Sequence, residues 1–565
     1  MKSTMQEIPL SVARILEYGA SVHRNTTVTT YFDETAEQTS FLHIGIRAAA
    51  MANMLRDEFG IERGDRVATV LPNCTEHLEV LLSVASMGAV FNPINRHLMD
   101  TQITHIINKA APKVLVLDPA CKEQIIPLLA DCPCVEAVLV IGPDFADTEA
   151  VQKLATARRD QDDQGEKGTP GLSHLRILNL EAELDGRSAD FDWPEMEETD
   201  PAAICFSTGT EGPPKGVVYS HRALWLHSMQ LRAADSFSIR NGTSFLCCVP
   251  IYHVLSWGVP LAAFMAGAPI VFTGRSATPE HLAHVIEDAM PRQAHGSPAV
   301  WTGLLVHYAK KHPKKMSLQE IYVGGSQVSP AMIDAWEERF GVDIIHSWGM
   351  TETGPVGTVA HPPAGVAGAA RAKYRESQGR FHAGMRYRIV DDHDNVLEAN
   401  DRNEGELQVR GNTVTASYYK DDSPRFTEDG WLRTGDIATV NKDGYLTIHD
   451  RKADIIRSGG EWIYSAALEN YLLEPAAVIE AAVIGIPSEK WGQRPLAVVV
   501  VAEGTPWTAE TAQNLAEELR ERVPGWMVPE NWTFVDHIDK TSVDKFDKKD
   551  LRQHFREGKF DIITV

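Results

Sequence analysis

Two periods of apolar residues alternate along the first part of the chain. Between about residues 40 and 145, stretches with an apolar stripe at helical spacing take turns with short stretches that are apolar throughout. The stripe in FLHIGIRAAAMANMLRDEFG predicts a helix, and RVATVLPN predicts a buried strand. The alternation continues through TEHLEVLLSVASMGA, VFNPIN, TQITHIINKAA and KVLVLD. Helices and strands in turn predict βαβ units and a parallel sheet.

Further along, the pattern divides the chain into parts. Residues 151–200 are polar and contain Gly and Pro, which predicts an exposed loop or insertion. After more βα alternation, the short alternating runs RYRIVDD, GELQVRG and GYLTIHD predict an antiparallel β subdomain over 380–450. The tail predicts a compact α+β domain. The sequence therefore predicts an α/β chain with a large N-terminal domain over 1–449 and a small C-terminal domain over 455–565.

Composition and charge narrow the class of protein. The chain has 565 residues and a net charge of −23, which argues against a nucleic-acid or anionic-membrane partner. No apolar run is long enough to span a bilayer, and the start does not resemble a signal peptide. The seven cysteines form no CxxC pair, so a zinc site is not expected. We expect a cytoplasmic protein with reduced thiols.

The most informative stretch is FSTGTEGPPKGVVYSH at 206–221. Its glycines expose backbone N–H groups, and its hydroxyls and one lysine add further donors. Such a loop after a buried strand predicts a phosphate cradle, although its spacing is not that of a Walker A motif. The alternative is a Gly/Pro surface turn. The candidate phosphate-binding residues are Ser207, Thr208, Gly209, Thr210 and Lys215.

This stretch resembles the phosphate-binding signature of the adenylate-forming superfamily, and six further blocks come in that family's order. The resemblance covers nearly the whole chain and is closest to medium- and long-chain fatty-acyl-CoA synthetases. It implies ATP, Mg²⁺ and CoA as ligands and a small carboxylic acid as substrate. It also implies a hinge at 450–454 about which a mobile C-terminal domain rotates between two reaction steps. A homodimer is left open.

The block HSWGMTETG at 346–354 resembles the family segment that serves ATP. The resemblance implies that Glu352 holds Mg²⁺ together with Thr208, and that Thr351 contacts the α-phosphate. Trp348, followed by Gly349, would flank the adenine or the acyl carboxylate. The alternative is the start of a helix, but adjacent Thr and Glu do not make a capping box.

Two more blocks resemble nucleotide-binding segments. In VGGSQVSP, the residues Gly324, Gly325 and Ser326 would lay backbone against adenine; the alternative is a strand-to-helix turn. In LRTGDIA, the carboxylate of Asp436 would accept both ribose hydroxyls, which suits its two acceptor oxygens. Arg451 would bind ribose or phosphate.

The block VPIYHVLSWG at 249–258 resembles the segment nearest the acyl group. It implies that His253 lies by the acyl carboxylate and that Trp257 lines the acyl tunnel, where Trp348 also contributes. For both His253 and Trp257 the alternative is a residue of the packed core.

The C-terminal domain carries two blocks. In RSGGEWIYS, Gly459 and Gly460 would approach the pantetheine arm of CoA, or else form a plain hairpin turn. In TSVDKFDKKDLR at 541–552, Lys545 matches the family's catalytic lysine. The neighbouring lysines are expected on a solvated face: Lys540, Lys548 and Lys549.

Four positions depart from the family pattern: Asp539, Asp544, Ala453 and Gln493. Asp544 replaces a glycine directly before Lys545, so its carboxylate can hold the ammonium and slow adenylation. The predicted function is an ATP- and Mg²⁺-dependent acyl-CoA synthetase that converts a fatty acid of medium or long chain to acyl-CoA through acyl-AMP and releases AMP and pyrophosphate. The alternatives are a ligase that passes the acyl group to an amine or carrier-protein thiol, and a catalytically weak nucleotide-binding homologue.

Overall fold

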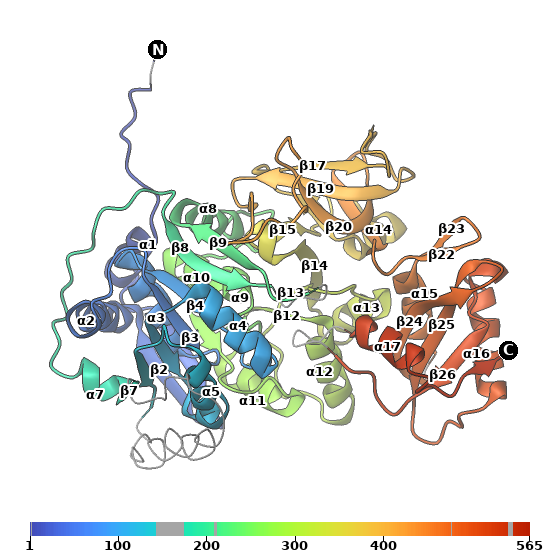
Figure 1. Cartoon of the computed structure of the whole chain (residues 1–565), viewed down its shortest axis with the longest axis horizontal. Coiled ribbons are helices and arrows are strands. Elements are labelled where there is room, and N and C mark those ends of the chain that lie inside the picture. Colours follow the sequence, from blue (N-terminus) through green and yellow to red (C-terminus); the bar gives the residue numbers. More distant parts are fainter. Residues whose placement is uncertain (2, 143–174, 208–211, 476, 541–545) are drawn as a thin grey trace, which may run out of the picture. The chain divides into compact units, whose positions relative to one another are not determined.

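The computed structural model describes residues 1, 3–142, 175–207, 212–475, 477–540 and 546–565 (Figure 1). By internal contacts the chain forms two units. The first unit comprises Met1–Gly324, Trp336–Val359 and Gly411–Pro424, and the second comprises Gly325–Ala335, Ala360–Arg410 and Arg425–Val565. This division groups the β subdomain with the C-terminal domain. The hinge expected at 450–454 stays a prediction.

Among the described residues, the first sheet of the first unit has seven strands, parallel except for the last pair. Their order is β7 (Arg176–Asn179), β6 (Ala137–Val140), β5 (Val114–Leu117), β3 (Arg66–Val70), β4 (Val90–Pro93), β8 (Pro201–Phe206) and β9 (Gly216–Ser220). Its connections contain α2 (Phe41–Phe59), α3 (Thr75–Ser86), α4 (Asp100–Ala110), η1 (Pro119–Cys121), α5 (Lys122–Leu128), η2 (Leu129–Asp131) and α7 (Leu180–Leu184). The prediction of βαβ units is confirmed.

Helix α2 shows how local sequence sets these elements. The Ser40 side chain accepts a hydrogen bond from the His43 backbone N–H and so caps the first turn. Gly60 ends the helix in a left-handed conformation with φ 56°. Between these caps, the apolar face of the helix is buried.

A second series of strands in the first unit is parallel in its centre and antiparallel at both edges. Its order is β2 (Ala36–Ser40), β1 (Thr27–Tyr31), β11 (Ile270–Phe272), β10 (Phe245–Cys247), β12 (Gln293–Gly296), β13 (Glu320–Gly324), β14 (Asp343–Gly349) and β15 (Val356–Val359). Because parallel strands end at a common edge, the segments after β10, β12 and β14 lie together there.

Helices and short helical turns accompany these strands. They are α1 (Val12–Val22), α8 (His221–Leu231), α9 (Val254–Trp257), α10 (Val259–Ala266), α11 (Pro279–Ala289), α12 (Pro298–Lys310), α13 (Pro330–Phe340) and η4 (Thr351–Thr353).

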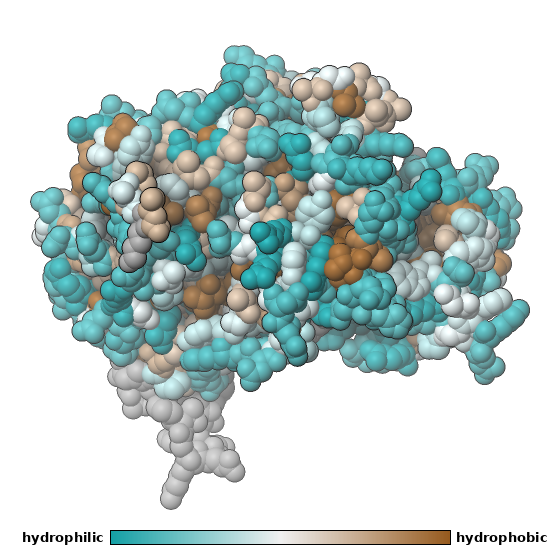
Figure 2. Space-filling view, turned by 90° about the horizontal axis from the view of Figure 1, so that it is seen from above, coloured by the Kyte–Doolittle hydropathy of each residue, from teal (hydrophilic) through white to brown (hydrophobic). Residues whose placement is uncertain are grey.

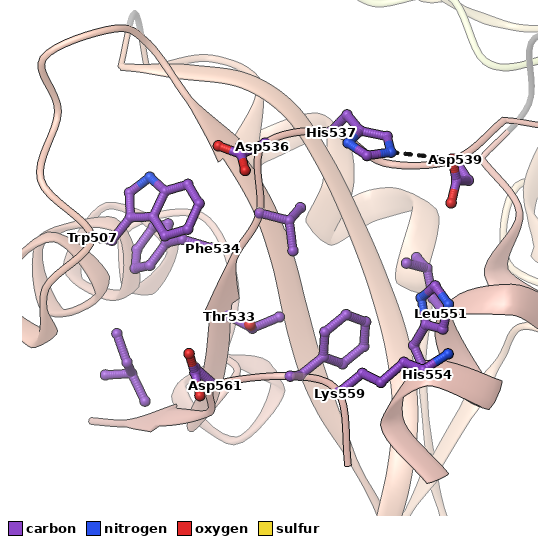
Figure 3. A pocket seen from close by; sticks show the side chains of 13 residues that line it. Trp507, Thr533, Phe534, Asp536, His537, Asp539, Leu551, His554, Lys559 and Asp561 are labelled. Carbon is purple, nitrogen blue, oxygen red and sulfur yellow. Dashed lines mark ion pairs between the residues drawn. The ribbon is translucent and has the colours of Figure 1, made fainter. Parts of the chain in front are cut away.

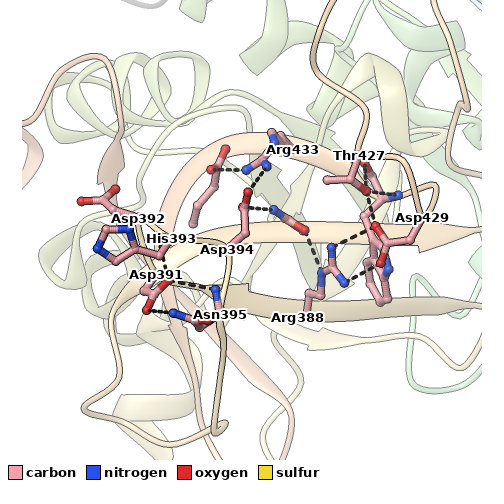
Figure 4. Close-up of polar contacts among 12 residues, drawn as sticks. Arg388, Asp391, Asp392, His393, Asp394, Asn395, Thr427, Asp429 and Arg433 are labelled. Atoms are coloured by element: carbon pink, nitrogen blue, oxygen red, sulfur yellow. Dashed lines mark hydrogen bonds and ion pairs between the residues drawn. The ribbon is translucent and has the colours of Figure 1, made fainter.

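In the second unit, six antiparallel strands form the predicted β subdomain. Their order is β18 (Val396–Leu397), β17 (Met385–Val390), β19 (Gly405–Gly411), β20 (Leu432–Val440), β21 (Tyr445–Arg451) and β16 (Gly379–Phe381), accompanied by α14 (Gly368–Glu376). Polar side chains tie these strands and their turns together (Figure 4). Arg433 donates to Asp394 at 2.7 Å, and Arg388 donates to Asp429 at 2.8 Å.

The C-terminal part of the second unit is the predicted α+β structure. Its sheet follows the order β23 (Glu461–Ile463), β22 (Ile456–Ser458), β25 (Gly492–Val501), β26 (Asn531–Phe534) and β27 (Ile563–Thr564), with β24 (Val478–Ser488) also paired to β25. The helices are α15 (Ser465–Leu472), α16 (Ala509–Arg520), η5 (Gly525–Met527) and α17 (Lys548–Arg556). Two apolar clusters pack beside it, one containing the fully buried Trp532 and the other Leu496.

One predicted loop contains regular structure. Residues 151–200 were expected to be irregular, but β7 and α7 lie within them, and β7 extends the first sheet beside β6. The face in Figure 2 is mainly hydrophilic, with apolar residues scattered in small groups. Among the described helices, none has both the length and the apolarity needed to cross a membrane.

Candidate functional site

The predicted phosphate loop joins two antiparallel strands of the first unit. β8 and β9 pair as far as Phe206 and Gly216, and the next pair closes the loop. The Ser207 N–H donates to the Lys215 carbonyl at 2.9 Å, and the Lys215 N–H donates to the Ser207 hydroxyl at 3.1 Å. Thr208, Gly209 and Thr210 lie outside the described residues.

The Lys215 side chain extends toward the segment Gly411–Pro424 of the same unit. Its ammonium donates to the Ser423 hydroxyl at 2.7 Å and lies 3.8 Å from an Asp421 carboxylate oxygen. It also lies 5.0 Å from the centre of the Tyr418 ring, within the range of a cation–π contact. Sequence reasoning did not identify these three neighbours, because they are far from Lys215 along the chain. Ser423, for example, is 208 positions away.

Glu352 contacts Tyr418 through the hydroxyl group, whereas Lys215 lies near the Tyr418 ring. It lies in the buried turn η4, and its carboxylate accepts a hydrogen bond of 2.5 Å from the Tyr418 hydroxyl. The carbonyl of its neighbour Thr351 accepts from the Tyr219 hydroxyl. Tyr418 therefore joins the predicted phosphate-binding lysine to the predicted magnesium-binding carboxylate.

The donor set suits magnesium when ATP is bound. Mg²⁺ commonly takes one or two protein carboxylates together with substrate phosphates and waters. A single buried carboxylate at Glu352, with a lysine nearby for the phosphates, fits that description. Within the described ranges, no group of three or more His, Cys, Asp or Glu side chains makes a metal site of its own.

Close backbone approach explains two of the predicted glycines. A Cβ at Gly324 would lie 2.4 Å from the Ser347 carbonyl oxygen, and one at Gly349 would lie 2.1 Å from the Pro355 carbonyl oxygen. Trp348, between Ser347 and Gly349, is buried. Gly325 has φ +90° and open space around it, and Ser326 is exposed. Both belong to the second unit.

The predicted acyl-side residues flank a turn after β10. His253 is half-buried and begins the turn, and Trp257 is buried at its end. A Cβ at Gly324 would lie 3.3 Å from the Trp257 ring. The Trp257 ring centre also lies 5.2 Å from that of His295, a residue that carried no sequence signal.

In the second unit, Asp436 and Arg451 face each other on β20 and β21. The Asp436 carboxylate is buried and lies 3.0 Å from the Arg451 Nε. Arg451 also donates to the Thr434 carbonyl at 3.2 Å. The structure thus brings together the two residues predicted to bind the ribose.

Gly459 and Gly460 form a two-residue hairpin between β22 and β23, with φ values of +62° and +92°. The Gly459 N–H donates to the Trp491 carbonyl at 2.8 Å. The flanking Ser458 accepts a 3.2 Å hydrogen bond from Arg494, which is also buried. Arg494 is a second residue that sequence reasoning missed.

The catalytic-lysine position, Lys545, lies outside the described residues, as does Asp544. The expectation of a solvated face was wrong for Lys548. Its ammonium lies 2.7 Å from the Glu469 carboxylate and donates to the Ser465 hydroxyl at 2.8 Å. Burial raises the pKa of Glu469 to about 7. Ser465 in turn donates to Asp450 at 2.7 Å, in the predicted hinge.

The second unit also contains a pocket of about 460 Å³, and none of the predicted site residues that the structure describes lines it (Figure 3). Aromatic residues such as Trp507 and Phe534 share its wall with His537 and Asp539, whose side chains lie 3.3 Å apart. His537 and Asp539 are largely exposed.

Comparison with known proteins identifies the family. The sequence model described as AMP-binding enzyme matches residues 16–419, and that of the AMP-binding enzyme C-terminal domain matches residues 467–545. The chain belongs to the AMP-binding enzyme family. The resemblance noted from the motifs is thereby confirmed.

This AMP-binding enzyme is similar to curated proteins along its whole length. It is 34% identical to the 3-methylmercaptopropionyl-CoA ligase of Ruegeria lacuscaerulensis over 99% of each chain. It is 32% identical to the medium-chain-fatty-acid–CoA ligase of Ectopseudomonas oleovorans over 98% of each chain. It is also 32% identical to the long-chain-fatty-acid–CoA ligase of Thermus thermophilus, over 98% of this chain and 97% of that relative.

Solved structures share the fold. An anthranilate CoA ligase in complex with anthranoyl-AMP matches with a TM-score of 0.84 at 21% identity, covering 99% of this chain and all of that one. ATP-bound MatB from Rhodopseudomonas palustris matches with a TM-score of 0.80 at 22% identity, covering 97% of this chain and 99% of that one.

Proposed function

We propose that this AMP-binding enzyme is an ATP-dependent acid–CoA ligase that works through an acyl-adenylate, and that its acid is a fatty acid of medium or long chain. The observation that supports ATP binding is that Lys215 and Glu352 both contact Tyr418. A cation and a carboxylate beside one ring suit a triphosphate and its metal ion. The relatives named as acid–CoA ligases support the rest.

In the first step, a carboxylate oxygen of the acid attacks the α-phosphorus of ATP, and the bond to pyrophosphate breaks. Negative charge grows on the phosphate oxygens in the transition state. Lys215 and Ser207, which are held together by two hydrogen bonds, offer donors that stabilise this charge. Glu352 would hold Mg²⁺, which when bound would add Lewis-acid stabilisation of this charge. Lys545 and Thr208 are proposed to act in the same step.

In the second step, the thiol sulfur of CoA attacks the acyl carbonyl carbon. The bond from that carbon to the AMP oxygen breaks, AMP leaves, and the thiol proton passes to solvent. Asp436, oriented by Arg451, holds the ribose hydroxyls in both steps. Gly459 and Gly460 offer a backbone without side chains along which the pantetheine arm can pass.

The acid itself has two candidates. His253, Trp257 and Trp348 are proposed to line its site. The medium- and long-chain relatives support a fatty acid. A short thioether acid, 3-methylmercaptopropionate, is the second candidate, because the relative that carries its name is 34% identical over nearly the whole chain.

The test is a panel of acids with ATP, Mg²⁺ and CoA, in which thioester and AMP are both quantified. The panel contains 3-methylmercaptopropionate and straight-chain acids of four to sixteen carbons. We expect the highest kcat/KM with an acid of eight or more carbons. Thioester from 3-methylmercaptopropionate alone would reject the fatty acid but keep the ligase.

Two further outcomes separate the rivals. Pyrophosphate release with transfer only to an added amine or carrier-protein thiol would reject CoA as the acceptor. Nucleotide binding without pyrophosphate release from any acid would instead identify a weak homologue, and an Asp544→Gly variant that gained turnover would explain it.

A further inference from the structure

The turn α9 winds in the unusual direction. Its four residues, Val254, Leu255, Ser256 and Trp257, have φ values of 51°, 54°, 54° and 52°. For Leu255 and Ser256 the ψ values are 40° and 46°, which completes the left-handed helical conformation. None of the four is a glycine. Residues in such conformations persist where their surroundings impose them, and they concentrate at functional sites.

Two buried side chains impose this conformation. The Ser256 hydroxyl donates to the Val249 carbonyl at 2.7 Å and lies 3.1 Å from His295 Nε2. The same Nε2 lies 3.0 Å from the Ser256 carbonyl. Ser256 and His295 are both fully buried. The backbone and the hydroxyl of the turn's third residue are thus fixed by one imidazole.

The hydrogen bonds also assign the protonation of His295. The Val249 N–H donates to Nδ1 at 3.3 Å, so Nδ1 carries no proton and Nε2 carries one. Nε2–H then donates to the Ser256 carbonyl. Burial lowers the pKa of His295 to about 4, which agrees with a neutral ring. Because His295 lies in β12, between β10 and β13, the sheet fixes the position of the ring.

The turn in turn fixes Trp257. Its indole packs against the imidazole, with ring centres 5.2 Å apart and planes inclined by 58°. It reaches the end of β13, where the missing side chain of Gly324 leaves room for it. Gly324 pairs with Ser347, the residue before Trp348. Trp257 therefore occupies the end of the parallel strands at which the acid is proposed to bind.

We propose that His295 and Ser256 are positioning residues that hold Trp257 in place and thereby set which acids the enzyme accepts. This inference rests on the proposed function. A right-handed path through the same four residues would direct the indole elsewhere and change the depth of the acyl site. Lys215 and Glu352 instead meet at Tyr418, so we expect the KM of ATP to be independent of this pair.

Replacements of His295 that each keep one nitrogen function give the sharpest test. His295→Gln places an amide N–H near the position of Nε2 and keeps a donor for the Ser256 carbonyl. His295→Asn keeps only an acceptor near the position of Nδ1 for the Val249 N–H. We expect His295→Asn to raise the KM of the preferred acid about tenfold and to shift the preferred chain length. We expect His295→Gln to stay within about threefold of wild type, and the KM of ATP to stay within about twofold in both.

The matched control is His77→Asn. His77 is also a fully buried histidine, bonded to Thr69 at 2.8 Å and to the Pro72 carbonyl at 2.9 Å, and its pKa is likewise lowered to about 4. Its replacement should lower the melting temperature but leave the chain-length profile unchanged. A wild-type profile in His295→Asn, or an equal rise in the KM of ATP, would overturn the proposal.

Two further measurements cover failure of folding or of activity. Ser256→Ala removes only one hydroxyl and should shift the chain-length profile in the same direction as His295→Asn, by a smaller factor. The fluorescence of Trp257, obtained as the difference between wild type and Trp257→Phe, needs no substrate. It should move to longer wavelength when His295→Asn is the background, and an unchanged difference spectrum would reject the positioning role. If the wild type forms no thioester, the proposed function fails, and this spectrum still decides the placement of Trp257.

Discussion

Two turns in the molecule have positive φ values and achieve them by opposite means. In the first unit, the turn Val254–Trp257 does so without glycine, whereas in the second unit Gly459 and Gly460 form the whole turn. A left-handed conformation costs a residue with a Cβ about 1–2 kcal/mol, and it costs glycine little. The first turn must therefore be held by its surroundings, and the second is allowed by its own residues.

The two turns also differ in what they present to their surroundings, either a large side chain or bare backbone. The strained turn ends in Trp257, a large side chain placed at a defined position against Gly324. The glycine turn delivers bare backbone, and no atom lies within 4 Å of a Cβ built on Gly460. The first suits the proposed selection of an acid by shape, and the second suits the proposed passage of a narrow pantetheine arm.

We expect the largest loss of stability and activity when a side chain is added at Gly324, against which the Trp257 ring packs. In Gly324→Ala, the new Cβ would lie 2.4 Å from a backbone oxygen of β14, which cannot move as a flexible side chain does. We expect a loss of about 3 kcal/mol in the free energy of unfolding and a fall in pyrophosphate release of about 100-fold. Denaturant unfolding and a pyrophosphate assay measure the two.

Gly325→Ala is the control for that experiment. Unlike Gly324, Gly325 has a positive φ, and a Cβ there meets no atom within 4 Å. It should therefore cost only the conformational term of about 1–2 kcal/mol. Equal losses in the two variants would show that the contact with β14 is unimportant.

Arg494→Met would remove the hydrogen bond that holds Ser458, the residue before the glycine turn. Arg494 donates to the Ser458 hydroxyl, to the Trp526 and Val528 carbonyls, and to Glu530. Its removal leaves buried acceptors without a hydrogen bond, and each such acceptor lowers the free energy of unfolding by about 1–3 kcal/mol. We expect CoA transfer from acyl-AMP to slow about tenfold, or roughly 1.4 kcal/mol, while single-turnover adenylation stays near wild type.

A lysine at the same position separates charge from geometry. Arg494→Lys keeps the positive charge but cannot reach several acceptors in a fixed fork. It should resemble Arg494→Met in CoA transfer. Recovery of the wild-type rate by lysine would mean that charge alone matters and that the turn is not held by the hydrogen bonds.

The sequence predicted the two turns unequally, and the reason is physical. The helix and strand alternation predicted the sheets, and contiguous motifs pointed to Lys215, Glu352 and the glycine pair. Nothing in Val-Leu-Ser-Trp predicts a left-handed turn. Positive φ is uncommon for residues other than glycine, and it is especially unfavourable for β-branched or bulky residues such as Val and Trp. Its cause is tertiary, in His295, 39 positions from Ser256.

The same limit applies to the other residues that were missed. Tyr418 is 66 positions from Glu352, and Arg494 is 36 positions from Ser458. Lys548 was assigned to a solvated face because its local pattern is charged, but it is paired with Glu469 on another helix. Local pattern predicts elements and loops, whereas the partners that fix a side chain come from distant segments.

Within the glycine turn, the two positions should respond differently to alanine. Both have positive φ, so each substitution carries a conformational cost of about 1–2 kcal/mol. At Gly459 the new Cβ would also lie 2.8 Å from the Trp491 ring, which must move. We therefore expect Gly459→Ala to slow CoA transfer about tenfold and Gly460→Ala about threefold, roughly 1.4 and 0.7 kcal/mol. A stopped-flow assay with preformed acyl-AMP measures both, and the reverse order would contradict the contact with Trp491.

The smallest and most direct test compares alanine and glycine at Ser256 in the strained turn. Both substitutions remove the hydroxyl and its hydrogen bonds to Val249 and His295, so that loss cancels between them. What remains is the cost of a Cβ at φ 54°, which glycine relieves. Ser256→Gly should therefore be more stable than Ser256→Ala by about 1 kcal/mol, the reverse of the usual order in a right-handed helix. Urea unfolding of the two variants side by side resolves this difference. If alanine were the more stable, the turn would not be left-handed in solution, and the contrast with Gly459 and Gly460 would disappear.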